Sequence, residues 1–122
     1  MRYNCKLSQI QANYFTDLAF EFCAKYHISP SLIAAIIVCE SSARPNVISK
    51  GGDYGLMQIY YKVYNVKNLL NSRVNIFAGT RILAQYRKGR TLKSALKRYS
   101  GGNKKYARKI LKVLIQIARG DI

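Results

Sequence analysis

Apolar side chains recur at helical spacing along most of the chain. Five of them share one face of a segment covering roughly residues 8–26: Phe15, Leu18, Ala19, Phe22 and Cys23. Helical spacing returns in three further segments between residues 74 and 117, which are separated by Gly89 and by the pair Gly101-Gly102. This pattern predicts a mainly α-helical fold with about five or six helices.

The most apolar segment predicts a central, buried helix. Ser29 can cap its start, and Pro30 suits the first helical turn because proline has no amide hydrogen to leave unpaired. Every side chain from Leu32 to Cys39 is apolar, and Glu40 follows directly. Partial desolvation at the end of such a helix would raise the pKa of Glu40. An ordinary charged residue at a helix end would have the same position, so position alone does not decide its role.

The helical pattern stops between Ala43 and about Tyr60. Residues that break helices are frequent here: Pro45, Asn46, Gly51, Gly52 and Gly55. We predict a structured loop or a short β-hairpin near residues 47–60. Loops of this length within a small domain usually carry function, so this segment is a candidate part of a site.

Length and composition indicate one globular domain. A chain of 122 residues suits a single hydrophobic core, so we predict one domain over residues 1–122. Hydrophobic residues make up 49% of the chain, and no segment is polar or repetitive enough to prevent folding. The longest apolar runs fall short of the roughly 20 residues that span a membrane. No apolar core of a signal peptide is visible between Met1 and Asn13.

Charge departs furthest from the average. The 21 Lys and Arg residues outnumber five acids, and the formal net charge is +16. The excess is C-terminal, since residues 62–122 hold 16 bases and a single acid, Asp121. A field of this sign attracts polyanions, but it does not distinguish nucleic acid from anionic lipid or anionic wall polymers.

Metal or cofactor chemistry is not indicated. Cys5, Cys23 and Cys39 have no metal-ligand spacing, and with the single His27 they do not form a set of four zinc ligands. We therefore expect neither a metal site nor a cofactor.

Four blocks of residues carry the candidate chemistry. In chain order they are Glu40-Ser41 with Pro45, Ser49 and Gly55-Leu56-Met57-Gln58-Ile59; Asn75-Ile76 with Gly79 and Ile82-Leu83; Ala95-Leu96 with Tyr99 and Gly101; and Tyr106 before Lys109-Ile110-Leu111. From about residue 28 to 112 this series resembles the motifs of lytic transglycosylases, enzymes of lysozyme-like fold that cleave peptidoglycan strands. Two departures are Ala43, where the family usually has Phe, and Tyr99-Ser100 in place of Tyr-Asn.

The resemblance implies a lysozyme-like fold with Glu40 as the catalytic acid. Breaking a glycosidic bond requires a proton for the leaving oxygen and stabilisation of a positively charged sugar. In the family the same residue then acts as base on the muramic acid 6-hydroxyl, which closes a 1,6-anhydro ring without water. Four residues are implied to line the cleft or orient groups in it: Ser49, Met57, Gln58 and Tyr99. Three motif residues are expected to be structural: Gly55, Asn75 and Gly79.

Asp53 introduces an alternative. The run from Asp53-Tyr54-Gly55 to Ile59 resembles the segment of C-type lysozymes that presents their second catalytic carboxylate, and specialised transglycosylases of secretion systems carry an acid near this place. If Asp53 faces Glu40 across the cleft, hydrolysis becomes feasible. A turn role would also explain Asp53, because Gly-Gly-Asp is a common turn sequence.

The sequence therefore predicts a monomeric peptidoglycan lytic transglycosylase acting in the cell wall or periplasm. Its substrate is the β-1,4 bond between MurNAc and GlcNAc, and its charge would draw it to anionic wall polymers or a membrane surface. A muramidase assisted by Asp53 is the second interpretation. A basic nucleic-acid-binding module is an interpretation of another class, which no motif supports. Phage-delivered, virion-associated and trimmed secreted settings all remain open.

Overall fold

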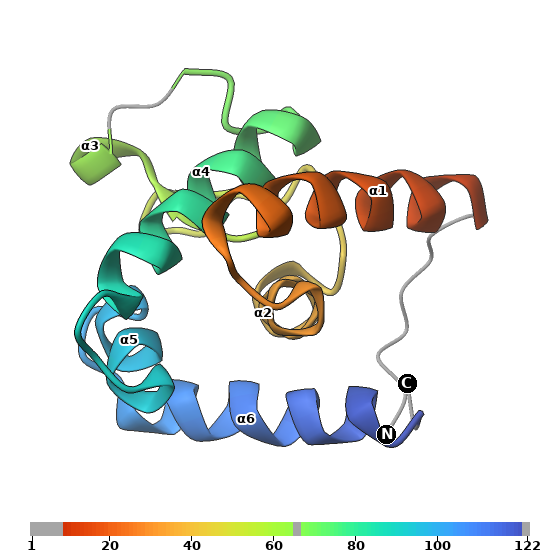
Figure 1. The fold of residues 1–122 in the computed structure, drawn as a ribbon. Coiled ribbons are helices and arrows are strands. Elements are labelled where there is room, and N and C mark those ends of the chain that lie inside the picture. The colour runs from red at the N-terminus through yellow and green to blue at the C-terminus, as the bar shows by residue number, and fades with distance from the viewer. Residues whose placement is uncertain (1–8, 65–66, 121–122) are drawn as a thin grey trace.

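Helices make up most of the computed structural model, which describes residues 9–64 and 67–120 (Figure 1). Its elements, in chain order, are α1 Gln9–Tyr26, α2 Pro30–Ser41, β1 Asp53–Tyr54, β2 Ile59–Tyr60, α3 Tyr61–Tyr64, α4 Ser72–Arg87, α5 Leu92–Tyr99 and α6 Lys104–Ala118. A mainly helical, lysozyme-like fold with one short hairpin is therefore confirmed. No helix among these described residues is long and apolar enough to cross a bilayer.

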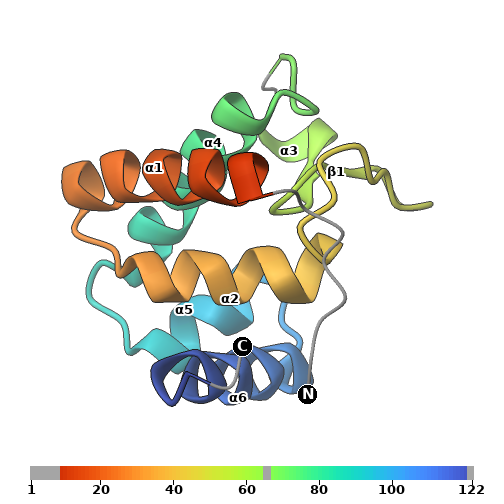
Figure 2. The ribbon, with the colours of Figure 1, turned by 90° about the vertical axis from the view of Figure 1, so that its right-hand side faces the viewer.

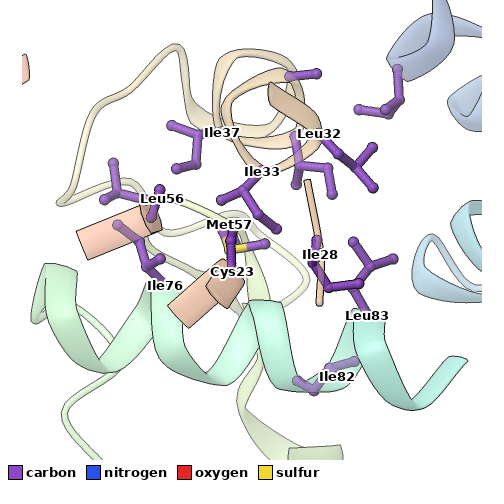
Figure 3. Close-up of a cluster of buried hydrophobic side chains, with 14 of the residues drawn as sticks. Cys23, Ile28, Leu32, Ile33, Ile37, Leu56, Met57, Ile76, Ile82 and Leu83 are labelled. Atoms are coloured by element: carbon purple, nitrogen blue, oxygen red, sulfur yellow. The ribbon is translucent and has the colours of Figure 1, made fainter. Parts of the chain in front are cut away.

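Helix α2 is the buried centre of the molecule. It runs between α1 and α6, nearly end-on in Figure 1 and from the side in Figure 2. Ile33, Ala35 and Ile36 have no exposed surface, because neighbouring helices cover this apolar segment from several sides. Figure 3 shows side chains from α2, the hairpin and α4 gathered in the core, among them Met57 and Leu83. Each large aliphatic side chain buried in this way stabilises the fold by about 1.5–3 kcal/mol.

The two ends of α2 are built differently. At its start Ser29 is the N-cap residue and Pro30 opens the helix, as predicted, but the Ser29 side chain makes no capping hydrogen bond. The Ser29 carbonyl instead accepts hydrogen bonds from the first free amides of the helix. At its end Ser42 and Ala43 both have positive φ, 52° and 60°, so the chain leaves the helix abruptly. This reversal leaves Glu40 in the last turn, at the end of the buried run.

The predicted break in the helical pattern is a short antiparallel hairpin. Asp53 pairs with Tyr60 and Tyr54 with Ile59, and the turn between them contains Gly55. Gly55 has a φ of +77°, and a Cβ atom there would lie 2.3 Å from Asn75 Nδ2. Only glycine therefore allows the turn to approach α4 this closely.

Asn75 joins the hairpin to α4. Its side chain is fully buried, and its Oδ1 accepts a hydrogen bond of 2.7 Å from the Met57 amide. Its Nδ2 donates to the carbonyls of Tyr54 and Leu69 at 2.7 and 2.8 Å. Gly79 lies one turn further along α4, where a Cβ would come within 2.3 Å of Met57 Sδ. Asn75, Gly55 and Gly79 thus have the structural roles expected of them.

Candidate active site

A cavity of about 490 Å³ lies where the end of α2 meets the hairpin and helices α4 to α6. It is lined by Glu40, Asp53, Gln58, Ile59, Tyr60, Ile82, Tyr86, Arg98, Tyr99, Ser100, Gly101, Asn103 and Tyr106. Four of the six residues singled out from the sequence are therefore brought to one cavity from three separate segments: Glu40, Asp53, Gln58 and Tyr99.

Glu40 combines burial with access to this cavity. Burial, together with the smaller effect of the nearby Asp53 charge, raises the pKa of its carboxyl to about 7, while Lys109 acts in the opposite direction. A free glutamate would be almost entirely ionised at neutral pH, whereas this one is about half protonated. The carboxyl can therefore hold a proton and, once it has lost that proton, can accept one.

Asp53 faces the cavity from strand β1 and is held there by Ser49. The Ser49 hydroxyl donates a hydrogen bond of 3.0 Å to Asp53 Oδ2 and accepts one of 3.0 Å from the Asp53 amide. The turn chemistry and the site position proposed for Asp53 therefore occur together. Ser49 itself is not among the lining residues of the cavity, so it contacts the site through Asp53.

Gln58 lines the cavity but is also tied to the loop backbone. Its Nε2 donates to the carbonyls of Val47 and Gly55 at 3.1 and 3.0 Å. Gln58 has a φ of 51°, which directs the chain back into β2. The side chain therefore closes the hairpin loop and forms part of the cavity wall.

The expected position of Met57 needs correction. Its side chain is fully buried and is packed against Gly79, so it does not line the cleft. Met57 fills core space beside Gly79, a role that motif matching alone does not separate from substrate contact. Its backbone nevertheless supports the site, because the Met57 carbonyl accepts a 2.9 Å hydrogen bond from the Tyr99 hydroxyl.

Tyr106 lies in the last of the four sequence motifs and also lines the cavity, a position that its motif did not predict. Its ring stacks on Tyr99 with centroids 6.3 Å apart, and its buried hydroxyl has no hydrogen-bond partner among the described residues. Burial, followed by the charge of Glu40, raises the pKa of Tyr106. A phenol on the otherwise apolar face of α6, near Ile110, was the signal available in the sequence.

Tyr60, Tyr86 and Arg98 also line the cavity and were not singled out beforehand. Tyr60 ends a two-residue strand, and the others lie at ordinary helical positions. No local pattern in the sequence distinguishes them from surface residues.

A central buried helix with a half-buried glutamate in its last turn, and a small sheet beside the same cavity, define a lysozyme-like domain. The family model for the transglycosylase SLT domain matches residues 17–116, and the chain belongs to this family. The matched domain acts on the peptidoglycan of the cell wall.

Proposed function

We propose that the protein is a peptidoglycan lytic transglycosylase that cuts the β-1,4 bond between MurNAc and GlcNAc, with Glu40 as the catalytic residue. The observation that carries this proposal is a carboxyl group on the cavity wall whose pKa is raised to about 7. A general acid works best when its pKa lies near the working pH. The family match supports an enzyme over the nucleic-acid-binding module considered above.

In the proposed reaction Glu40 transfers its proton to the glycosidic oxygen as the bond from that oxygen to C1 of the muramic acid breaks. The sugar ring then carries positive charge, which the negative charge of the Asp53 carboxylate stabilises. The ionised Glu40 next takes the proton of the muramic acid 6-hydroxyl. That oxygen forms a bond to C1, so a 1,6-anhydro ring closes, Glu40 regains its proton, and no water is consumed.

The surrounding residues have supporting roles in this proposal. Ser49 holds Asp53 in place, and Gln58 shapes the cavity wall while closing the hairpin loop. Tyr99 binds the Met57 carbonyl and stacks on Tyr106, so it keeps α5 and α6 aligned with the hairpin. The motif residues other than Glu40 and Asp53 therefore act mainly by positioning.

Hydrolysis by a muramidase mechanism is the second candidate, because Asp53 lines the same cavity and its charge acts on Glu40. Mass analysis of purified peptidoglycan digested by the protein separates the two reactions. Anhydro ends, which lack one water per cut, are expected. Reducing ends as the main product would instead favour hydrolysis.

Asp53→Asn is expected to keep the anhydro product while lowering the cleavage rate by about tenfold, because a neutral amide stabilises a positive sugar less well. Removing the Asp53 charge also lowers the pKa of Glu40, so activity should decline at a lower pH than in the wild type. Rates measured from pH 5 to 8 test both effects. Asp17→Asn, an exposed site on α1, is the matched control. An unchanged pH profile in Asp53→Asn would contradict the proposed coupling.

Tyr106→Phe is expected to leave the stability unchanged or to raise it by up to about 1 kcal/mol, because the hydroxyl that is removed has no hydrogen-bond partner in residues 9–64 and 67–120. The same change should lower kcat more than it raises KM, since this hydroxyl is close enough to Glu40 for its charge to act on the phenol. Tyr26→Phe, at a half-buried position on α1, controls for the loss of a phenol elsewhere. Wild-type kcat in Tyr106→Phe would show that the hydroxyl is only a packing feature.

The positive C-terminal half supports a further part of the proposal, namely attraction to anionic wall polymers or to an anionic membrane surface. Five exposed bases lie on α6: Lys104, Lys105, Arg108, Lys109 and Lys112. Long-range attraction of this kind raises the concentration of enzyme at its substrate and weakens with salt. We propose that the enzyme acts as a monomer in the cell wall or periplasm.

A further inference from the structure

A second hollow adjoins the cavity of Glu40 beside α5. Its volume is about 470 Å³, and it is lined by Tyr86, Ser94, Lys97, Arg98, Gly101 and Gly102. Tyr86, Arg98 and Gly101 line the first cavity as well. The two hollows therefore adjoin one another, and a ligand bound beside Glu40 has only this shared wall to cross to reach the second one. We call this second hollow the cationic recess.

The charged groups of the cationic recess are both basic. Lys97 and Arg98 line it together with no acid, and neither forms an ion pair within the described part of the chain. Among the described residues, a salt bridge joins Arg73 on α4 to Glu21 on α1, and neither of these residues lines the recess. Two neighbouring cations without a carboxylate partner repel one another, and an anionic ligand would relieve that repulsion.

The backbone of the recess adds no further donor at its glycine turn. The Gly101 amide donates to the Arg98 carbonyl at 3.1 Å, and the Gly102 amide donates to the Lys97 carbonyl at 2.7 Å. These bonds fix the turn and leave the ligand to be recognised by side chains. The recess therefore offers a guanidinium and an ammonium group, which pair well with a carboxylate.

We propose that the cationic recess binds a free carboxylate of the peptide attached to muramic acid, and that the enzyme therefore favours strands whose peptides carry that carboxylate. This inference rests on the proposed function. A muramic acid beside Glu40 carries its peptide on a covalent linkage, so the peptide is the anion that the substrate itself brings to the adjoining recess. A phosphate on the 6-hydroxyl of the same sugar fits less well, because it would block the ring closure proposed above.

Binding measurements on the Glu40→Gln variant test the proposal without turnover of the ligand. Three soluble probes are compared: a GlcNAc–MurNAc disaccharide with a tetrapeptide, the same compound with its peptide carboxyls capped as amides, and the disaccharide without peptide. Calorimetry should show that the free-carboxyl probe binds about tenfold more tightly than the capped one, as expected for a charge-assisted pair. The difference should shrink at high salt, because Arg98 is exposed.

Substitutions of Lys97 and Arg98 then test whether the recess causes the difference in affinity between the free-carboxyl and capped probes. Lys97→Gln combined with Arg98→Gln, in the Glu40→Gln background, should bind the free and capped probes equally. Lys67→Gln combined with Arg81→Gln removes the same charge from exposed positions outside the recess and should keep the tenfold preference. The single variants Lys97→Gln and Arg98→Gln provide the same comparison if thermal unfolding shows that the double variant does not fold.

Several results would overturn the inference. They are equal binding of the free and capped probes before any change to the recess, loss of the preference in the Lys67 and Arg81 control, and tighter binding of a 6-phosphorylated disaccharide than of the free-carboxyl probe. Failure of the proposed function gives a different result. In that case the wild-type protein would leave purified peptidoglycan uncut, while the recess could still distinguish the free from the capped peptide.

Discussion

Glu40→Gln is expected to lower the rate of peptidoglycan cleavage by about 1,000-fold, within the range that general acid catalysis supplies. Glutamine has nearly the same shape as glutamate but cannot give a proton to the leaving oxygen. The measurement is release of soluble fragments from purified peptidoglycan at pH 6, where most Glu40 carboxyls are protonated. Glu21→Gln is the control, because Glu21 forms an exposed ion pair with Arg73 away from the cavity.

The pH dependence of the wild-type enzyme follows from the same group. Because the pKa of Glu40 is about 7, the protonated fraction falls as the pH rises through 7, and the cleavage rate should fall with it. A rate that stays constant from pH 6 to pH 8.5 would contradict Glu40 as the acid, as would full activity of Glu40→Gln.

Stability measurements separate loss of catalysis from loss of fold. The pKa of Glu40 rises from 4.5 in the unfolded chain to about 7 in the folded protein. The folded state therefore binds more protons between these pH values, and its stability falls as the pH rises through that range. Glutamine does not ionise, so Glu40→Gln should be the more stable protein above pH 7, by up to about 3 kcal/mol. Below pH 4.5 the two proteins should unfold alike.

Asn75→Ala is expected to lower the free energy of unfolding by about 3–5 kcal/mol, which is exceptional for a single side chain. The change removes two buried hydrogen bonds and a partly buried one, and it leaves the Met57 amide and the carbonyls of Leu69 and Tyr54 without their partner. Each buried polar group left unpaired costs about 1–3 kcal/mol. Urea denaturation followed by circular dichroism gives the free energy directly.

Two further variants sharpen the Asn75 result. Asn71→Ala removes the residue that caps α4 with one exposed hydrogen bond, and it should cost only about 1 kcal/mol. Asn75→Asp keeps an oxygen that can accept from the Met57 amide. It replaces the donor to the carbonyls of Tyr54 and Leu69 with a second oxygen, which repels them, so this variant should also be strongly destabilised. If Asn75→Ala costs no more than Asn71→Ala, Asn75 does not anchor the hairpin.

Loss of the Asn75 anchor should also affect catalysis. The hairpin carries Asp53, and Asn75 holds the Tyr54 carbonyl that follows it in β1. A loosened hairpin would let the Asp53 charge move relative to Glu40. The position of the second carboxylate therefore depends on a residue of α4 that never contacts the cavity.

Several elements could be predicted from local patterns because their causes are local. The first helix was expected over roughly residues 8–26 and is observed over Gln9–Tyr26. The start of α2 at Pro30 and the hairpin between 47 and 60 were also correct. Helical periodicity, proline geometry and glycine-rich turns all act within a few residues. Ser29 is the N-cap residue as predicted, but its side chain makes no capping hydrogen bond. The amides of Leu32 and Ile33 donate to the Ser29 carbonyl instead.

The sequence by itself determined the class of fold, the central apolar helix and the glutamate at its end, because hydrophobic periodicity and composition indicate which helix faces are buried in the core. Only the tertiary structure decided which residues meet. It brought Asp53, Arg98 and Tyr106 to the cavity of Glu40, buried Met57 against Gly79, and placed Lys97 in the adjoining recess. Those neighbours come from distant segments, and their contacts depend on how the helices pack around α2 rather than on any spacing along the chain.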